Sequence, residues 1–373
     1  MAVKLRKLAK KTFIILNIVP TVLMAIVCLV PWLHAGKFWW AALLGLGFPL
    51  LLALQVGFLI FWLLFRSRWA FMPLISLLLS FQQIGVLFAF GSESEFGVKK
   101  KKGTFRVVSW NVSLWDEYNR QKKGTSYRQN MLDLLAKSDA DVFCFQEFFE
   151  SKNQQKHKPT IVEFTQKMGY PYHYFAVEGE RYKGSYRSGI LIFSKHPIID
   201  SMRIRFRNNS RAESLVACDI RVNGKVYRIA TTHLQSVLFD SKDYEGISQF
   251  GKTEKATIET PKAIVPKLRR AYVYRSTQAE QVRAFLDSTD VPVILTGDFN
   301  DVPNSYTYFK IRKDMQDAFL EKGFGMGRTF RKISPTLRID YIFADPRIAI
   351  EGFGLKKVPY SDHYPLMADF VLP

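Results

Sequence analysis

The first 91 residues contain no aspartate or glutamate, which constrains the fold more than any other feature of this 373-residue chain. The same stretch holds eight of the 53 Lys and Arg residues and three long apolar runs, Thr12–Trp32, Phe38–Phe65 and Trp69–Phe90. Each run is long enough to cross a hydrocarbon core of about 30 Å as a helix. A soluble domain could not bury about 80 residues that lack a polar face. The pattern predicts three transmembrane helices within residues 1–91.

Basic residues flank these runs unevenly. Five lie at the N-terminus and Arg66 and Arg68 follow the second run, which places seven on one side of the membrane. The other side has Lys37 and the four lysines of 99–102, which makes five. Because basic residues are enriched on the cytoplasmic side, and three crossings separate the two ends, the count predicts a multi-pass membrane protein with a non-cytoplasmic C-terminal domain.

Residues 92–103 are predicted to be a lysine-rich linker. Their four lysines either hold the next domain near anionic lipid head groups or form a solvated end to the last helix. Residues 104–373 have the size of one large domain. The chain after position 91 holds 45 basic and 33 acidic residues, and this surplus suits a polyanionic substrate, nucleic acid included.

Short β-rich runs recur through residues 104–373, with helical patterns between some of them. The predicted strands cover residues 105–109, 142–146, 189–193, 214–220, 226–232, 291–296, 338–343 and 366–371. The predicted helices are Tyr127–Lys137, Thr160–Met168 and Arg270–Asp287. Ser236–Pro266 has mixed charges and no clean period, so it is predicted to be a mobile loop. The combination predicts a mixed sheet or a sandwich with outer helices.

Polar side chains suited to catalysis follow many of these strands. They are Asn111, Glu147, His233, Asp298, Asn300, Asp340, Asp362 and His363. Because side chains at the strand ends of one sheet meet at one edge, we expect this set to converge. Carboxylate and amide oxygens are the ligands that Mg²⁺ prefers, and two histidines can supply a base and an acid for phosphoester hydrolysis. Read singly, Asn111 and Asp340 also suit a turn or a cap.

Six motifs in a fixed order resemble the endonuclease/exonuclease/phosphatase superfamily, in particular its deoxyribonuclease-like and sphingomyelinase-like members. They are Ser109-Trp-Asn-Val, Phe145-Gln-Glu, Thr231-Thr-His-Leu-Gln, Gly297-Asp-Phe-Asn-Asp, Arg338-Ile-Asp-Tyr-Ile and Ser361-Asp-His-Tyr-Pro. The resemblance spans about residues 104–373. It implies an α/β (α+β) fold, a four-layer α/β/β/α sandwich, and hydrolysis of phosphoesters with Mg²⁺, or Mn²⁺ in its place.

The resemblance also implies a metal site. Glu147 would be the main metal ligand, with Asn111 beside it and Asp362 near the metal. Abasic-site endonucleases of the superfamily have an acid two residues after the motif asparagine, where this chain has Ser113. That departure argues against an abasic-site enzyme.

The catalytic roles follow from the same resemblance. Asp298 and Asn300 would position water and phosphate, and His363 would pair with Asp340. His233 matches the second histidine of deoxyribonuclease-like and sphingomyelinase-like members, which abasic-site endonucleases replace.

The other histidines and the cysteines stand outside any motif. His34, His157, His173 and His196 are predicted to be surface or interfacial residues. Cys28, Cys144 and Cys218 lack the spacing of a metal site or a redox motif, so they are predicted to be inert buried thiols.

The sequence therefore predicts a membrane-anchored, Mg²⁺-dependent phosphodiesterase, a metal-dependent phosphoric ester hydrolase. Its membrane segment favours membrane lipids as partners and a phospholipid head group as substrate. One alternative is a membrane-tethered nuclease that acts on DNA or RNA. The other is a non-catalytic membrane scaffold, against which the intact set of site residues argues. No protein partner and no cofactor other than the metal is predicted.

Overall fold

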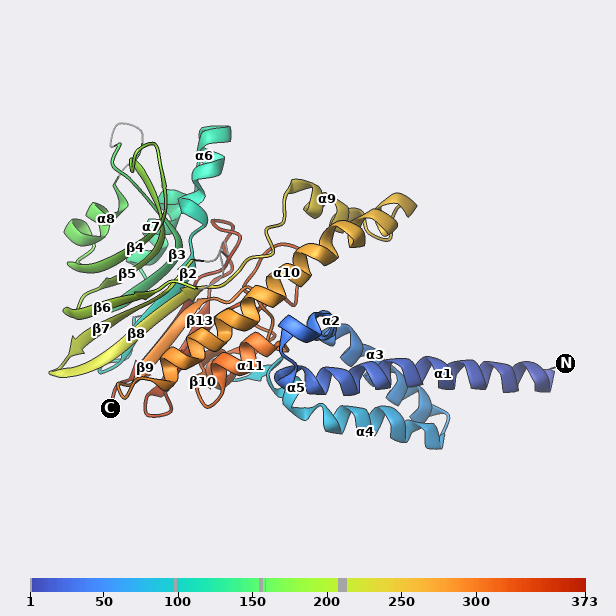
Figure 1. The fold of residues 1–373 in the computed structure, drawn as a ribbon. Coiled ribbons are helices and arrows are strands. Elements are labelled where there is room, and N and C mark those ends of the chain that lie inside the picture. The colour runs from blue at the N-terminus through green and yellow to red at the C-terminus, as the bar shows by residue number, and fades with distance from the viewer. Residues whose placement is uncertain (1, 97–98, 154–156, 158, 207–212) are drawn as a thin grey trace.

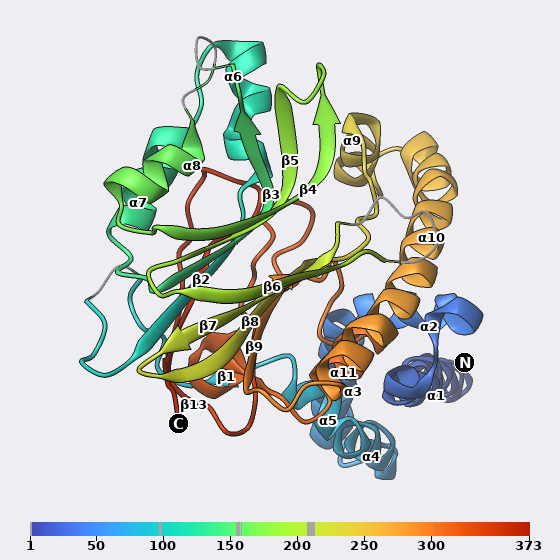
Figure 2. The same ribbon diagram turned by 60° about the vertical axis from the view of Figure 1, so that its left-hand side comes forward.

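The computed structural model of the chain describes residues 2–96, 99–153, 157, 159–206 and 213–373. Two six-stranded sheets lie face to face in the C-terminal part (Figures 1 and 2). The first has the order β10 (Gln316–Asp317), β12 (Asp340–Ala344), β9 (Val293–Asp298), β8 (Lys225–His233), β7 (Leu215–Val222), β6 (Ile198–Ile204). The second has the order β13 (Ala349–Leu355), β14 (Leu366–Val371), β2 (Phe105–Asn111), β3 (Val142–Ser151), β5 (Tyr186–Ser194), β4 (Tyr172–Arg181).

Three buried layers hold the sandwich together. Between the sheets, inward-facing side chains such as Val107, Cys144 and Ile294 form one apolar cluster. Helices α7 (Arg128–Ala136) and α8 (Thr160–Val162) cover the outer face of the second sheet, while α10 (Glu254–Asp287) and α11 (Tyr306–Arg312) cover the first. Each strand thus alternates its side chains between two apolar layers. This arrangement confirms the predicted α+β sandwich.

The strands missed by the sequence analysis lie at the edges of the sheets. All eight predicted strands are present, but the edge strands β4, β6, β10 and β13 and the short two-stranded pair of β1 (Ala89–Phe90) with β11 (Phe324–Gly325) were not predicted. An edge strand faces solvent on one side, so much of its length is half-buried or exposed and no continuous apolar run marks it.

The prediction of a mobile loop at Ser236–Pro266 was wrong. The segment contains α9 (Ser241–Gln249) and the first half of α10, a helix of 34 residues. Asp240 and Asp243 form a capping box at the start of α9, and the Thr253 side chain caps α10. The first half of α10 is mostly exposed and contains two prolines, which hide its helical pattern.

The prediction of three transmembrane helices was also wrong. Among the described residues, one helix, Leu8–Trp32, is long and apolar enough to cross a membrane; it joins α1 (Ala2–Leu29) to η1 (Val30–Trp32). The second run is bent by 53° between α2 (Ala35–Leu46) and α3 (Phe48–Leu64), and counts as a span only if the pair is taken together. Gly47 and Pro49 lie at this bend.

The third apolar run forms only short helices. It forms η2 (Arg68–Ala70), α4 (Phe71–Leu79) and α5 (Phe81–Gly85), broken at Ser80. Signal sequences and the core helices of soluble proteins share the length and composition of Leu8–Trp32. The prediction that the C-terminal domain is non-cytoplasmic depended on three crossings, so the structure does not support it.

The N-terminal helices pack directly against the sandwich. Gly45 of α2 lies so close to the Asn304 carbonyl that a Cβ atom would stand 2.0 Å from its oxygen. The Arg338 guanidinium donates to the Val86 carbonyl at 2.6 Å and to Asp317 at 2.7 Å. These contacts join residues 35–90 to the loops beside β9 and β12.

The predicted linker also lies on the sandwich. The Ser94 amide donates to the Phe353 carbonyl at 2.6 Å, and Phe96 is buried. Lys100 forms an ion pair with Asp141. This pairing leaves Lys100 unavailable to lipid head groups in the observed arrangement.

Candidate active site

Three neighbouring strands place polar residues in one row at the edge of the first sheet. His233, the last residue of β8, lies beside Asp298, the last residue of β9. Asp298 in turn faces Asp340, the first residue of β12. On the second sheet, Asn111 ends β2 opposite Gln146 of β3. The two sheet edges therefore meet above a common site, as the strand-end pattern predicts.

Side-chain hydrogen bonds join the two edges. The Gln146 Nε2 donates across the sandwich to Thr231 Oγ1 at 2.7 Å. The Asn111 amide donates to Glu147 Oε1 and to Asp298 Oδ2, each at 3.1 Å. These bonds hold the carboxylates of the two sheets together.

Backbone irregularities aim the acids into the site. Glu147 has φ +49° within a bulge of β3, a conformation that costs free energy in a residue with a Cβ. Gly297 has φ +139°, and a Cβ there would stand 2.0 Å from the Thr232 carbonyl oxygen. The glycine of the Gly-Asp-Phe-Asn motif thus lets β8 and β9 approach closely where His233 and Asp298 emerge.

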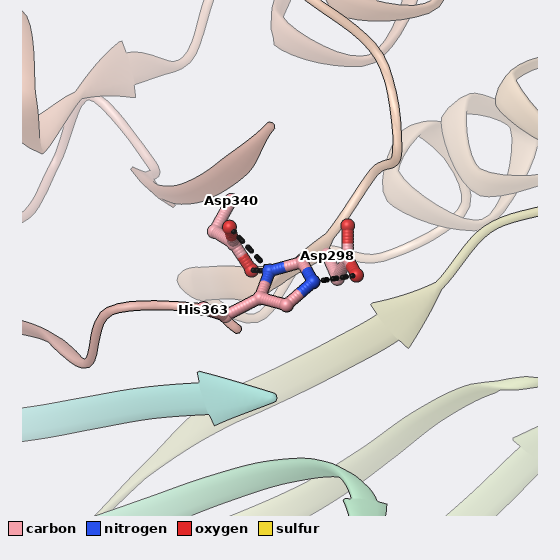
Figure 3. A group of neighbouring side chains, drawn as sticks. All are labelled: Asp298, Asp340 and His363. Atoms are coloured by element: carbon pink, nitrogen blue, oxygen red, sulfur yellow. Dashed lines mark hydrogen bonds and ion pairs between the residues drawn. The ribbon is translucent and has the colours of Figure 1, made fainter. Parts of the chain in front are cut away.

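Two histidines converge on one carboxylate. His363 Nδ1 bonds to Asp340 Oδ2 at 2.9 Å, and its Nε2 lies 3.5 Å from Asp298 Oδ2, so the ring lies between two acids (Figure 3). His233 Nδ1 bonds to Glu213 Oε2 at 3.1 Å, and its Nε2 also lies 3.5 Å from Asp298 Oδ2. Asp298 is only 1 % exposed.

These surroundings favour the charged form of both rings. Burial alone would lower the pKa of His233, but Glu213, Asp298 and Glu147 together raise it to about 10. Burial likewise opposes charge on His363, yet Asp340 and Asp298 raise its pKa well above the usual value. The neighbouring carboxylates therefore favour the imidazolium form of both rings, which suits a phosphoryl group.

Asn300 braces the central carboxylate. The backbone N–H of Asn300 donates to Asp298 Oδ1 at 2.9 Å, and its side-chain Nδ2 donates to the Leu234 carbonyl at 3.1 Å. It also lines the cavity above Asp298.

The predicted metal ligands fit a hard divalent cation by their chemistry. Glu147 and Asn111 are in direct contact, whereas Asp362 lies at the same cavity and pairs with Lys332 at 3.0 Å. Burial, Glu213 and Asp362 raise the pKa of Glu147, which means that they disfavour its ionised carboxylate. A bound cation would stabilise that carboxylate. The donors are oxygens, which suit Mg²⁺ better than a thiophilic ion.

A second group of side chains also brings potential metal-ligand atoms together. The ligand atoms of Asp298, Asp340 and His363 lie within 4.8 Å of one another. His363 Nδ1 is already hydrogen-bonded to Asp340, so we interpret this group as a charge-stabilised imidazole rather than as a metal site.

A cavity of about 360 Å³ opens over the assembled residues. One end of the cavity is lined by six of the eight residues that the sequence singles out: Glu147, His233, Asp298, Asn300, Asp362 and His363. Asn111 and Asp340 stand behind them as hydrogen-bond partners of Glu147 and His363.

Sequence reasoning missed two charged residues of the site and misplaced a histidine. Glu213, just before β7, and Lys332, in the loop before β12, belong to no motif. His157 was predicted to lie at the surface or an interface, but it is buried against Glu117 and Tyr186. Cys144 is buried as predicted, and burial raises its pKa to about 12.

The model of the Endonuclease/Exonuclease/phosphatase family matches residues 108–363, more than half of the chain. The chain belongs to this family. It is accordingly a phosphoric ester hydrolase of a metal-dependent class, as its motifs predict. A second model, described as Domain of unknown function (DUF8431), matches residues 10–87. No curated protein matches the chain.

Solved structures are similar over the sandwich. An endonuclease/exonuclease/phosphatase from Beutenbergia cavernae is 20% identical with a TM-score of 0.50, covering 73% of this chain and 72% of that chain. The human Nocturnin catalytic domain with bound sulfate is 15% identical (TM-score 0.48; 73% and 96% covered). The Bacteroides thetaiotaomicron mannosyl-6-phosphatase is 14% identical (TM-score 0.46; 72% and 100% covered). The first of these similarities shows a shared fold.

Proposed function

We propose that the chain is a membrane-attached, Mg²⁺-dependent phosphodiesterase. One observation carries the reaction: two imidazoles, each backed at Nδ1 by a carboxylate, meet at Asp298 beside Glu147. This arrangement offers positive charge for the phosphoryl group, a proton donor for the leaving oxygen and a carboxylate that can orient water.

In the proposed reaction, water attacks phosphorus and one ester P–O bond breaks, which leaves a phosphomonoester and an alcohol. Asp298 takes up one proton of the attacking water and then returns it to His233, whose Nε2 lies 3.5 Å from Asp298 Oδ2. His363 stabilises charge on the phosphoryl oxygens. His233 gives its proton to the leaving oxygen. A divalent cation held by Glu147, Asn111 and Asp362 would supply further charge neutralisation there.

The N-terminal part supports attachment to a membrane. We assign residues 1–91 to a membrane region, 92–103 to a connecting segment and 104–373 to the catalytic domain. Helices α1 to α4 project from the sandwich (Figure 1) and carry most of the exposed large apolar side chains among the described residues. Such a surface suits contact with lipid. A phosphoester in the same membrane, such as a phospholipid head group, is then the nearest substrate.

The test is hydrolysis by the full chain of bis-p-nitrophenyl phosphate, phospholipid vesicles and plasmid DNA, with Mg²⁺ or EDTA. We expect EDTA to abolish turnover and Mg²⁺ to restore it. Glu147→Gln should remove most of the Mg²⁺-dependent rate, while Glu245→Gln, an exposed change on α9, should leave it unchanged. Turnover that survives EDTA, or an unimpaired Glu147→Gln enzyme, would overturn the proposal.

A further inference from the structure

The cavity over the catalytic residues has a second, apolar end. Its wall there is formed by side chains from four parts of the fold, namely α2, the loop after β8, α10 and the loop before β12: Leu46, Val237, Ile264, Leu268, Phe330 and Leu337. Leu46 is the last residue of α2 and therefore belongs to the N-terminal region. We call this end of the cavity the apolar groove.

Close packing holds α2 at the groove. Leu46 packs against the cluster of Val302, Phe330, Leu337 and Ile339. The preceding turn of α2, at Ala42 and Leu43, contributes to a cluster with Tyr272 and Leu268 of α10. The tight approach of Gly45 to Asn304 fixes the same end of the helix. The docked N-terminal region therefore forms part of the wall of the groove.

Charge in the groove is already neutralised. Arg275 lines the cavity but is 1 % exposed, pairs with Asp301 at 3.1 Å and donates to the Gln235 carbonyl at 2.9 Å. A nucleotide chain would bring further phosphates that need cations along its path. The groove instead offers hydrocarbon surface next to a single phosphate-binding end.

The position of the groove points to the membrane side of the molecule. In both ribbon views the N-terminal helices and the first half of α10, with α9, project from the same side of the sandwich (Figures 1 and 2). The groove lies between the bases of these projections, since Leu46 belongs to one and Ile264 to the other. Phe250 and Ile258 are exposed on the α9–α10 projection, as in segments that touch a lipid surface.

We propose that the apolar groove holds a hydrocarbon chain of the substrate while the phosphate lies over Glu147, His233 and His363. The substrate is then a membrane lipid, and the N-terminal region forms part of its binding site through Leu46. This inference rests on the proposed phosphodiesterase function and adds the part of the site that binds the lipid chain.

The experiment uses the full chain in nanodiscs with Mg²⁺ and a water-soluble reporter, p-nitrophenyl methyl phosphate. Alkylphosphonates of one to eight carbons compete with the reporter, and isothermal calorimetry measures their binding directly. Burying one methylene strengthens binding by about fourfold. We expect octylphosphonate to bind at least about tenfold more tightly than methylphosphonate.

Two variants narrow the groove from different sides, Leu46→Trp on α2 and Ile333→Trp on the half-exposed loop. Each should remove most of the advantage of the octyl chain. Leu50→Trp is the matched control because Leu50 is 68 % exposed and does not line the groove, so the advantage should remain. Partition of the octyl chain into lipid is the same for all three variants. A loss seen in the groove variants and not in Leu50→Trp therefore reports on the groove.

The two proposals fail in different ways. Absence of reporter turnover with any divalent metal would overturn the phosphodiesterase, while calorimetry would still report on the groove. A reporter that is turned over, with equal affinity for methyl- and octylphosphonate, would overturn the groove and leave the hydrolase. If octylphosphonate still binds more tightly than methylphosphonate in both groove variants, the groove proposal is likewise overturned and the hydrolase stands.

Discussion

Glu213 contacts His233 in the same way as Asp340 contacts His363, because each carboxylate is hydrogen-bonded to Nδ1 of its imidazole. The Nδ1–oxygen distance is 3.1 Å in the Glu213–His233 pair and 2.9 Å in the Asp340–His363 pair. Both rings then direct Nε2 toward the same oxygen of Asp298. The site therefore contains two carboxylate–imidazole pairs that face each other. Glu213 precedes β7 and His233 ends β8, whereas Asp340 begins β12 and His363 precedes β14. The symmetry suggests that the two rings act on opposite sides of one phosphoryl group.

Glu213→Gln should weaken proton donation by His233, because the charge that stabilises the imidazolium is lost. We expect kcat/KM to fall by about 10- to 100-fold on an alkyl phosphodiester, within the range of general acid effects. The loss should be much smaller on an aryl phosphodiester, whose leaving group departs unprotonated. A merely structural Glu213 would lower both rates alike.

Removing either imidazole separates their roles. His233→Ala should cost about 10²–10⁴-fold on an alkyl phosphodiester and less on an aryl one. His363→Ala should lower both rates to the same degree, because it stabilises the phosphoryl group rather than the leaving oxygen. The measurement is kcat/KM for each variant on both substrates. Equal losses for His233→Ala would make His233 a phosphate-binding residue only.

Asp141 gives a prediction for stability against pH. Burial alone would raise its pKa, but His196, Lys100 and the Arg106 amide lower it below the usual value. A lowered pKa in the folded state stabilises the protein above the unfolded pKa, and this contribution is lost as pH falls through the folded value. Asp141→Asn should lower the free energy of unfolding by roughly 1–3 kcal/mol at pH 7.

The difference between the wild-type chain and Asp141→Asn should begin to shrink as the pH falls below about 3.9, the usual pKa of an unfolded Asp, and should be lost as the pH passes through the lowered pKa of the folded carboxyl. Thermal unfolding of both proteins at pH 7 and pH 3.5 measures it. Asp139→Asn is the control, because Asp139 is more exposed and makes only a long ion pair with Lys195 at 3.5 Å. A difference that is constant with pH would show that the ionised form of Asp141 contributes nothing.

A pair of glycines tests the docking of the N-terminal region. An alanine in a helix is normally more stable than a glycine by up to about 1 kcal/mol. Gly57→Ala on α3 should follow this rule, since no atom lies within 4 Å of the new Cβ. Gly45→Ala should lower the melting temperature, because its Cβ meets the Asn304 carbonyl. Melting curves with shifts of the same sign for both variants would contradict the packing of α2.

The convergence of several candidate site residues was predictable because they lie at strand ends within short motifs. Local sequence places His233 and Asp298 at strand ends, and adjacent strands then bring them together. Glu213 was not predictable in this way, since it reaches His233 from the start of another strand and no motif surrounds it. Its contact depends on how β7 pairs with β8.

The N-terminal region was the harder part to predict. Hydropathy finds apolar runs, but it does not show where a helix bends, and the breaks at Gly47 and Ser80 divide runs that are long enough to span. The docking of α2 on α10 depends on tertiary packing between residues more than 200 positions apart, which a single sequence does not display.

The contact between Arg338 and Val86 joins residues 252 positions apart and sets an order of events during synthesis. The N-terminal helices leave the ribosome long before the strand that follows Arg338 has been made. Until then, Leu46 and its neighbours have no partner loop to face, and the apolar groove does not yet exist. A nascent chain released early would thus present bare hydrocarbon surface without a binding site, which is the kind of intermediate that chaperones engage.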